Sequence, residues 1–226
     1  MTAKRIAVLA AAGILFAAAT GAVTRGQQSP RKPTPQSLAA KIPVNVKRAM
    51  LDSIIASSSP TADDKQGGFH EEGGMWVTTT DGQIVAETAI PGKYAKPGVP
   101  AHLRANDPAN PLPAERIAGV GGVWHVHPCG EIVTRRVLPE KDEGDRKIIT
   151  TIVTTTYFGQ PPSDGDIAAV QLPVNIEIGA RSQVVYFYDR SGVTGTMPLE
   201  EFLAPLQLPP GAVCWSVEAG KPSTSN

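Results

Sequence analysis

The sequence predicts an α+β domain in which a mostly antiparallel sheet is flanked by helices. Short β-prone runs separated by turn residues occupy most of the chain, and helical periodicity is confined to a few segments. Gly (22) and Pro (21) are plentiful whereas aromatic residues make up only 5%, a composition that favours many turns and short elements. The hydrophobic fraction of 41% over 226 residues is enough for one ordinary core.

The N-terminus has the three parts of a secretory signal peptide. Lys4 and Arg5 precede an uncharged, mostly apolar run over 6–20, and Gly21 and Ala22 follow as small residues. We therefore expect residues 1–22 to be a signal peptide and the protein to be periplasmic or secreted. An uncleaved membrane anchor is the alternative, although the run is short for a membrane span.

The composition divides the rest of the chain into three parts. Residues 23–40 form a predicted flexible linker, because 25–36 are rich in Pro, Gln, Ser and Arg and lack apolar periodicity. Residues 41–219 form the predicted folded domain, and 220–226 a polar, disordered tail. Lys plus Arg (21) equals Asp plus Glu (21). The chain therefore lacks the excess of basic residues that would indicate a nucleic-acid partner.

The chain has two cysteines, Cys129 and Cys214. In an exported protein an even pair favours a disulfide, which would hold the C-terminal segment beside the loop after His127. Two unpaired thiols are the alternative that spacing leaves open.

The first half of the domain begins with a helix and a hairpin. Apolar residues at helical spacing predict an amphipathic helix over 46–57. Two β-prone runs, 75–80 and 83–88, are joined by Asp81-Gly82, which predicts a hairpin with a type I′ turn. Residues 90–114 contain six prolines and predict a long irregular connection.

The second half contains most of the predicted strands. Residues 117–127 predict a central strand, and two β-prone runs at 132–138 and 147–158 predict a hairpin whose turn is the charged stretch 139–146. The remaining predicted elements are a short helix over 163–171, strands over 176–178, 183–188 and 193–197, and a helical turn that begins at Pro198.

Two histidines two residues apart are the first candidate metal ligands. His125 and His127 lie at the end of the predicted central strand, where Pro128 stops it. Residues i and i+2 of a strand point to the same face, so both imidazoles could reach one metal ion. Two histidines alone are weak evidence, because a zinc site needs three or four such ligands.

Ser163 and Asp166 allow two interpretations. Ser163 at the N-cap and Asp166 three residues later resemble a capping box, which would explain their spacing without any function. The same geometry also places a carboxylate on the first helical turn, where Asp166 could be a third ligand of a catalytic zinc site.

Glu71 is the candidate general base. It enters the first predicted strand just before Gly73 and Gly74, which let backbones approach closely. Glu72 is its rival, but alternation along the strand would send Glu72 to the opposite face. His70 and His102 belong to no such group and are expected at the surface.

These pieces together resemble the JAMM motif of the JAB1/MPN metalloprotease superfamily. The motif is formed by Glu71-x-x-Gly74, His125-x-His127-Pro128 and Ser163-x-x-Asp166, in this order. The sequence Trp-His-Val-His-Pro around the histidines and the later Val-Tyr-Phe-Tyr-Asp-Arg-Ser-Gly are similar to the bacterial DUF4329 branch. The resemblance covers roughly residues 45–205. It implies the JAB1/MPN fold, which is cytidine-deaminase-like, with the hairpin 132–158 as an insertion. About 35 residues separate His127 from Ser163, more than the family usually has.

The resemblance also implies a role for each residue. His125, His127 and Asp166 would hold Zn²⁺ with a water in the fourth position. Glu71 would deprotonate that water, and Ser163 would hydrogen-bond the developing oxyanion. The implied substrate is a peptide or protein cleaved at an amide or isopeptide bond.

Two other functions remain open. The domain could be a silent MPN-like binding or structural module of an envelope or secretion assembly, since the exposed edges of the Thr-rich hairpin could pair with a partner strand. A toxin-system effector is suggested only by the family's associations.

Cys129 beside the histidines could also ligate zinc, although a disulfide is expected instead.

Overall fold

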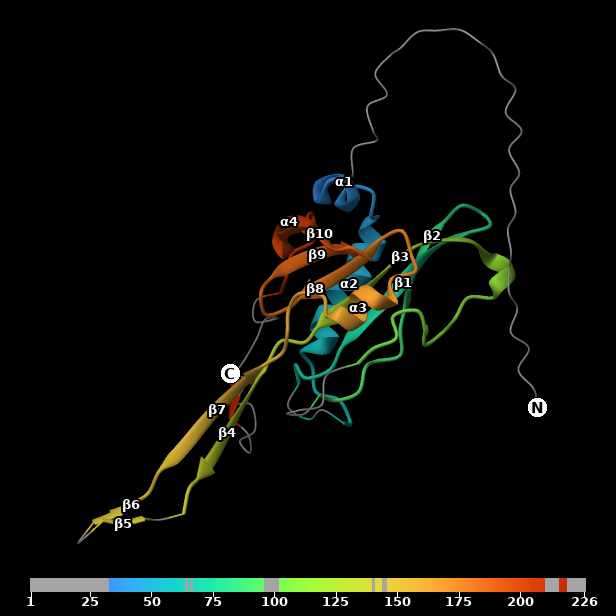
Figure 1. The fold of residues 1–226 in the computed structure, drawn as a ribbon. Coiled ribbons are helices and arrows are strands. Elements are labelled where there is room, and N and C mark those ends of the chain that lie inside the picture. The colour runs from blue at the N-terminus through green and yellow to red at the C-terminus, as the bar shows by residue number, and fades with distance from the viewer. Residues whose placement is uncertain are drawn as a thin grey trace, which may run out of the picture. The chain divides into compact units, whose positions relative to one another are not determined.

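The central sheet has six strands in the order β10-β9-β8-β3-β1-β2 (Figure 1). The computed structural model describes residues 33–63, 65, 67–95, 102–139, 141–143, 146–209 and 216–218. Within this sheet β3 and β8 run parallel, and the other neighbouring strands run antiparallel. The predicted α+β class with a mostly antiparallel sheet is therefore confirmed. The strands are β1 Glu72–Thr79, β2 Ile84–Thr88, β3 Ile117–His127, β8 Asn175–Gly179, β9 Val184–Asp189 and β10 Gly192–Pro198.

The helices of the described residues are short except for one. They are α1 Pro35–Ala39, α2 Val44–Ser57, α3 Asp164–Ala169 and α4 Leu199–Leu203, with a 3₁₀ turn at Ala114–Arg116. The predicted helices over 46–57 and 163–171 correspond to α2 and α3, and the helical turn expected after Pro198 is α4. α1 lies inside the range predicted as linker, and its Ala39 is buried in the core, so packed structure begins before residue 41.

The predicted hairpin after residue 74 is confirmed, but its turn is different. β1 and β2 pair antiparallel, with Thr78 opposite Ile84. Gly82 has a positive φ of 83°, whereas Asp81 does not have a positive φ, so the two-residue type I′ turn is wrong. The side chain of Thr79 instead accepts a hydrogen bond from the backbone N–H of Gln83 at 3.0 Å, which stabilises a longer loop.

A second hairpin leaves the end of β3 and leads away from the six-stranded sheet (Figure 1). β4 Glu131–Val137 and β7 Thr151–Tyr157 pair antiparallel, as predicted, and β11 Ser216–Glu218 joins β4 in parallel. The predicted strand over 147–158 is in fact divided, because β5 Lys141–Glu143 and β6 Arg146–Ile148 form a separate small ladder. The stretch expected to be only a turn therefore contains strand β5.

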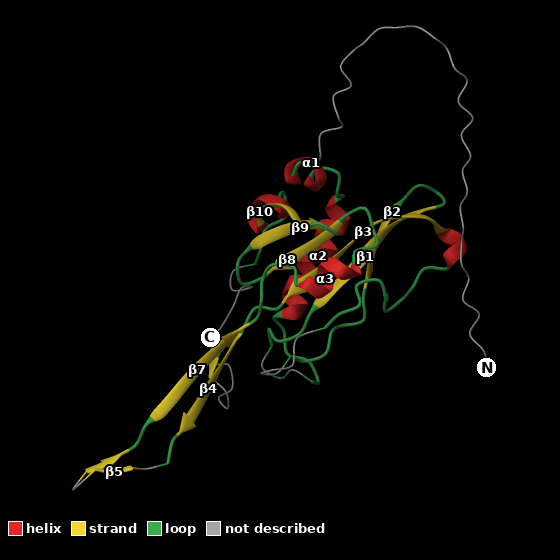
Figure 2. Cartoon of the chain, viewed as in Figure 1, coloured by secondary structure: helices red, strands yellow, loops and turns green. Residues whose placement is uncertain are grey.

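The main core lies between α2 and one face of the sheet (Figure 2). Met50 and Ile54 of α2 are fully buried together with Trp124 and Val126 of β3. The indole N–H of Trp124 donates to the hydroxyl of Ser53 on α2, at 3.2 Å. Because successive side chains of a strand alternate between faces, packing Trp124 and Val126 onto α2 sends His125 and His127 to the other face.

Candidate metal centre

His125 and His127 form the middle of a cluster of titratable groups on the face of the sheet opposite α2. Their Nε2 atoms lie 3.3 Å apart, and both side chains are buried. In a tetrahedral zinc site with Zn–N bonds of about 2.0–2.1 Å, two nitrogen ligands stand about 3.3–3.4 Å apart. The histidine pair therefore has the separation that one shared metal ion requires.

The contact made by Nδ1 of His127 decides which ring nitrogen carries the proton when the imidazole is neutral. Nδ1 lies 2.8 Å from the carbonyl oxygen of Gly159. A carbonyl oxygen only accepts, so Nδ1 carries the proton and donates. The lone pair of Nε2 then faces the cluster. The hydrogen bond from Nδ1 to Gly159 is of the kind that orients histidine ligands in metal sites.

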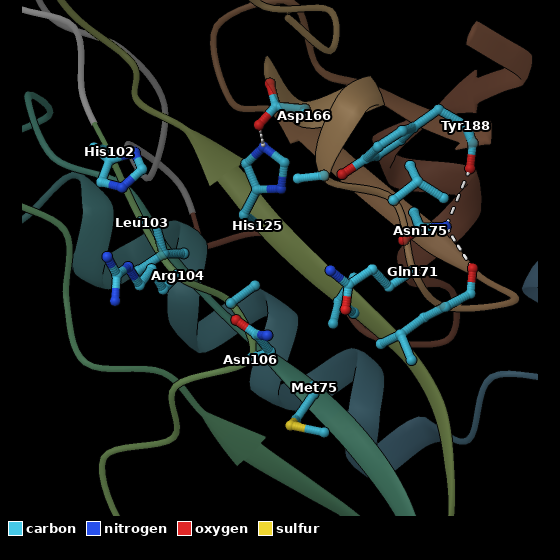
Figure 3. Close-up of a pocket in the computed structure, with 15 residues that line it drawn as sticks. Met75, His102, Leu103, Arg104, Asn106, His125, Asp166, Gln171, Asn175 and Tyr188 are labelled. Atoms are coloured by element: carbon cyan, nitrogen blue, oxygen red, sulfur yellow. Dashed lines mark hydrogen bonds and ion pairs between the residues drawn. The ribbon is translucent and has the colours of Figure 1, made fainter. Parts of the chain in front are cut away.

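Asp166 reaches the histidines from the first turn of α3. Its Oδ1 lies 3.5 Å from His125 Nε2, and its Oδ2 lies 3.7 Å from His127 Nε2. Figure 3 shows the Asp166 carboxylate directed at the His125 ring. Burial alone would raise the pKa of Asp166, but His125, the hydrogen bonds from Ser163 and His127 outweigh it and lower the pKa.

The same carboxylate also closes the predicted capping box. The hydroxyl of Ser163 accepts from the backbone N–H of Asp166 at 3.3 Å, and Asp166 Oδ2 accepts from the backbone N–H of Ser163 at 2.8 Å. The Ser163 hydroxyl also donates to Oδ2, at 2.5 Å. Capping and facing the histidines, which the sequence left as alternatives, are both true of Asp166, because the cap fixes the direction of its side chain.

Glu71 and Glu72 separate as strand alternation predicts. Glu71 Oε1 lies 3.8 Å from His127 Nε2 on the cluster side. Glu72 Oε1 instead lies 3.2 Å from Nε2 of His70, away from the cluster. Burial raises the pKa of Glu71, and Asp166 and Glu177 add to the rise, while the two histidines oppose it.

The expectation for His70 is wrong. Its side chain is 1% exposed, because the loop that follows α2 packs against the end of that helix. The hydroxyl of Ser57 on α2 donates a hydrogen bond to the His70 carbonyl oxygen at 3.1 Å. The nearby Glu72 carboxylate offsets the burial of its ring. His102 is exposed, as expected.

The structure adds a residue that the sequence analysis missed. Glu177 lies on β8 directly opposite His125 in the parallel β3–β8 pair. In sequence it stands between Ile176 and Ile178, which is typical of a strand whose charged residue faces solvent. Here Glu177 is 0% exposed, and α3 lies over that face of the sheet (Figure 2). The sequence signal was limited to a carboxylate between two isoleucines of a predicted strand, because the pairing of that strand with the histidine strand is a property of the tertiary structure.

Four of these side chains can jointly hold a metal ion. One ligand atom from each of His125, His127, Asp166 and Glu177 lies within 4.8 Å of all the others. Cys129 is not part of this group, although it is buried two residues after His127. Cys214 lies outside the described residues, so the Cys129–Cys214 disulfide stays a prediction.

A cavity of about 430 Å³ opens beside the cluster (Figure 3). His125 and Asp166 line one end of it, and Met75, Leu103, Val123 and Leu172 supply apolar walls. Tyr188 reaches toward the His125–Asp166 pair, and its ring meets His125 edge to face with 6.4 Å between centroids. Burial raises the pKa of Tyr188, so its hydroxyl keeps its proton at neutral pH and can donate a hydrogen bond.

Comparison with known proteins found no matching family model, curated protein or solved structure. Within the part of the chain that the structure describes, no helix has the length and apolar character needed to span a membrane. The predicted signal peptide, 1–22, lies outside the described residues.

Proposed function

We propose that this chain is a zinc-dependent metallohydrolase of the JAMM type that cleaves a peptide or isopeptide bond outside the cytoplasm. The observation that carries the proposal is the convergence of His125, His127 and Asp166, from separate parts of the sequence, with the Glu71 carboxylate at the edge of the same cluster. The JAB1/MPN fold is part of the proposal. It is supported by the order of the helix, hairpin, histidine strand and capped helix along the chain.

The donor set fits zinc in its chemistry as well as its spacing. Two imidazoles and a carboxylate are common ligands of catalytic zinc, and such sites keep a position for water. Zinc held there would act as a Lewis acid and lower the pKa of a bound water to about 7. His127 and Asp166 are oriented by hydrogen bonds to Gly159 and Ser163, so the protein presets the ligands.

Glu71 is the residue that would move the proton. Its carboxylate lies beside His127 but is not one of the three proposed zinc ligands, so it is free to accept a proton from the attacking water and pass it to the leaving amine. The raised pKa of Glu71 brings the carboxyl nearer to neutral pH, where accepting and releasing a proton are both feasible.

The cavity next to His125 is where the substrate would lie. Its apolar walls suit an aliphatic side chain next to the scissile bond, and the Tyr188 hydroxyl can donate a hydrogen bond toward the carbonyl oxygen. Ser163 was expected to assist the oxyanion. Its hydroxyl contacts Asp166 here, so we assign it first to holding that ligand, and the oxyanion role stays a prediction.

The test combines metal content with hydrolysis of a peptide library by the full chain. We expect zinc-dependent cleavage that a chelator abolishes and zinc restores. Glu71→Gln should abolish turnover and keep the zinc, whereas Glu72→Gln, the neighbour on the opposite face, should keep both. Zinc-loaded protein in which Glu71→Gln and Glu72→Gln have equal activity would refute the assignment of the base.

A second function is favoured by the surface of the hairpin β4–β7. Val137, Ile152, Val153 and Tyr157 are large apolar side chains that are 45–62% exposed on it. β11 pairs with part of β4, whereas β7 lies at the edge of this sheet among the described residues, and such an edge can pair with another strand. Deleting 138–147 separates the two functions, since a binding module would lose its partner and keep its zinc.

A further inference from the structure

Glu177 occupies the most protected position in the cluster. It lies in the middle of β8, and every residue of that strand is buried. Its carboxylate is 0% exposed, whereas the side chain of Asp166 is 26% exposed. A carboxylate placed so deeply must find a partner for its charge, because burying an unpaired charge is very costly.

Neither oxygen of Glu177 has a hydrogen-bond partner. Oε1 lies 2.9 Å from His127 Nδ1, but this nitrogen carries a single proton and also lies 2.8 Å from the Gly159 carbonyl oxygen, so two acceptors compete for it. Oε2 lies 3.4 Å from His125 Nε2, a nitrogen whose lone pair the metal would use. The histidines are therefore near enough to share a cation with Glu177, and the one contested imidazole proton does not fully compensate its charge.

Glu177 and Asp166 stand in equivalent positions relative to His125. Their nearest oxygens lie 3.4 and 3.5 Å from its Nε2. Both distances are close to the separation of about 3.3–3.4 Å expected for two ligands of one tetrahedral metal ion. A bound divalent cation would satisfy the orphaned carboxylate and neutralise the two acidic groups together.

We propose that Glu177 is a fourth protein ligand of this metal, so that the centre is a two-histidine, two-carboxylate site. The inference rests on the metal centre of the proposed function. With four protein ligands, a hydrolytic water would have to join as a fifth, an expansion that catalytic zinc sites allow. Adding an oxygen donor also widens the range of metals that fit, because carboxylates suit Mn²⁺ and imidazoles suit Fe²⁺ and Zn²⁺.

The rival is a carboxylate that only orients the histidines from outside the coordination sphere. Mutation of such an outer residue typically lowers metal affinity by about 10–100-fold. Loss of a ligand should lower metal affinity further, to the level expected for Asp166→Asn. The affinity measurement must therefore be combined with a structure that shows whether Glu177 contacts the metal.

The experiment uses the full chain, freed of metal and titrated with Zn²⁺ against a chelator of known affinity. We expect wild type to bind one zinc per chain. Glu177→Gln should reduce affinity more than about 100-fold, as Asp166→Asn does, since each removes a ligand. Asp164→Asn, an exposed acid on the same helix, is the matched control and should leave affinity unchanged. A crystal structure of the zinc-bound wild type should place a Glu177 oxygen about 2.0–2.2 Å from the metal.

Three results would overturn the proposal, and they are distinguishable. Zinc bound by wild type with equal affinity in Glu177→Gln would remove Glu177 from the site and leave the proposed function intact. A zinc-bound structure with Glu177 more than about 3 Å from the metal would do the same, whatever the affinity. A wild-type protein that folds and binds no zinc would refute the proposed function itself. Circular dichroism of metal-free Glu177→Gln checks folding, and this nearly isosteric change should not destabilise it, because it removes a buried charge.

Discussion

The Nε2 atoms of His125 and His127 lie 3.3 Å apart on one face of β3, although strand alternation alone requires only that the two rings share that face. The ring of His127 is oriented by the hydrogen bond from its Nδ1 to the carbonyl oxygen of Gly159, a residue that follows the hairpin β4–β7. The hairpin β4–β7 is thus followed by a residue that contacts the candidate metal ligands.

Replacing both histidines should remove the metal. We expect His125→Ala combined with His127→Ala to bind no zinc, because the two remaining carboxylates lose both nitrogen donors. Metal analysis of the purified protein measures this. His102→Ala, which removes an exposed histidine at the cavity, should retain one zinc per chain. Undiminished zinc in the double variant would place the metal elsewhere.

Zinc should stabilise the folded chain through Asp166. At a free zinc concentration about 100 times Kd, binding adds about 2.7 kcal/mol to the free energy of unfolding. Urea unfolding with and without zinc checks this value. Asp166→Asn should lose most of the gain, and Asp164→Asn should keep it. An equal gain in both variants would exclude Asp166 as a ligand.

Glu71 should make the metal-free protein less stable as pH rises. Its folded-state pKa is raised above the ordinary value of 4.5, chiefly by burial, so the folded state holds the proton more tightly than the unfolded state. The stability linked to the neutral carboxyl is therefore present below pH 4.5 and is lost as pH rises through the raised pKa.

The comparison with Glu71→Gln isolates this effect. With chelator present, the variant should equal wild type in acid and become the more stable of the two as pH rises above 4.5. Melting temperature against pH gives the curve for each. Parallel curves would show that Glu71 is not perturbed by burial in the folded chain.

Gly73 should not tolerate a side chain. It faces His125 across the β1–β3 pair, and a Cβ there would overlap the carbonyl oxygen of Trp124 and stand 2.8 Å from the Cα of His125. We expect Gly73→Ala to cost about 1–3 kcal/mol and to weaken zinc binding, since β3 would have to shift.

Gly119 is the matched control for this substitution. It lies on β3 with nothing within 4 Å of an added Cβ. Gly119→Ala should therefore be neutral or slightly stabilising, because a less flexible unfolded chain is the main change. Equal destabilisation by both substitutions, measured by urea unfolding, would contradict the close approach at Gly73.

The amino-acid sequence alone determined the pieces that follow local rules. Alternation along β3 and β1 predicted the shared face of His125 and His127 and the opposite directions of Glu71 and Glu72. The Ser163–Asp166 spacing predicted the cap of α3, and periodicity predicted α2. Each depends on residues close in sequence, where backbone geometry decides which side chains meet.

The tertiary structure decided everything that depends on which strands are neighbours. Glu177 lies in the cluster of titratable groups because β8 pairs with β3 in a register that puts Glu177 beside His125, and no local pattern encodes that register. The burial of His70 has the same origin, since the packing of a loop beneath α2 is a long-range contact. Asp166 as both cap and candidate ligand follows from the two levels together: its local cap sets the direction of the side chain, and the fold brings the histidines to it.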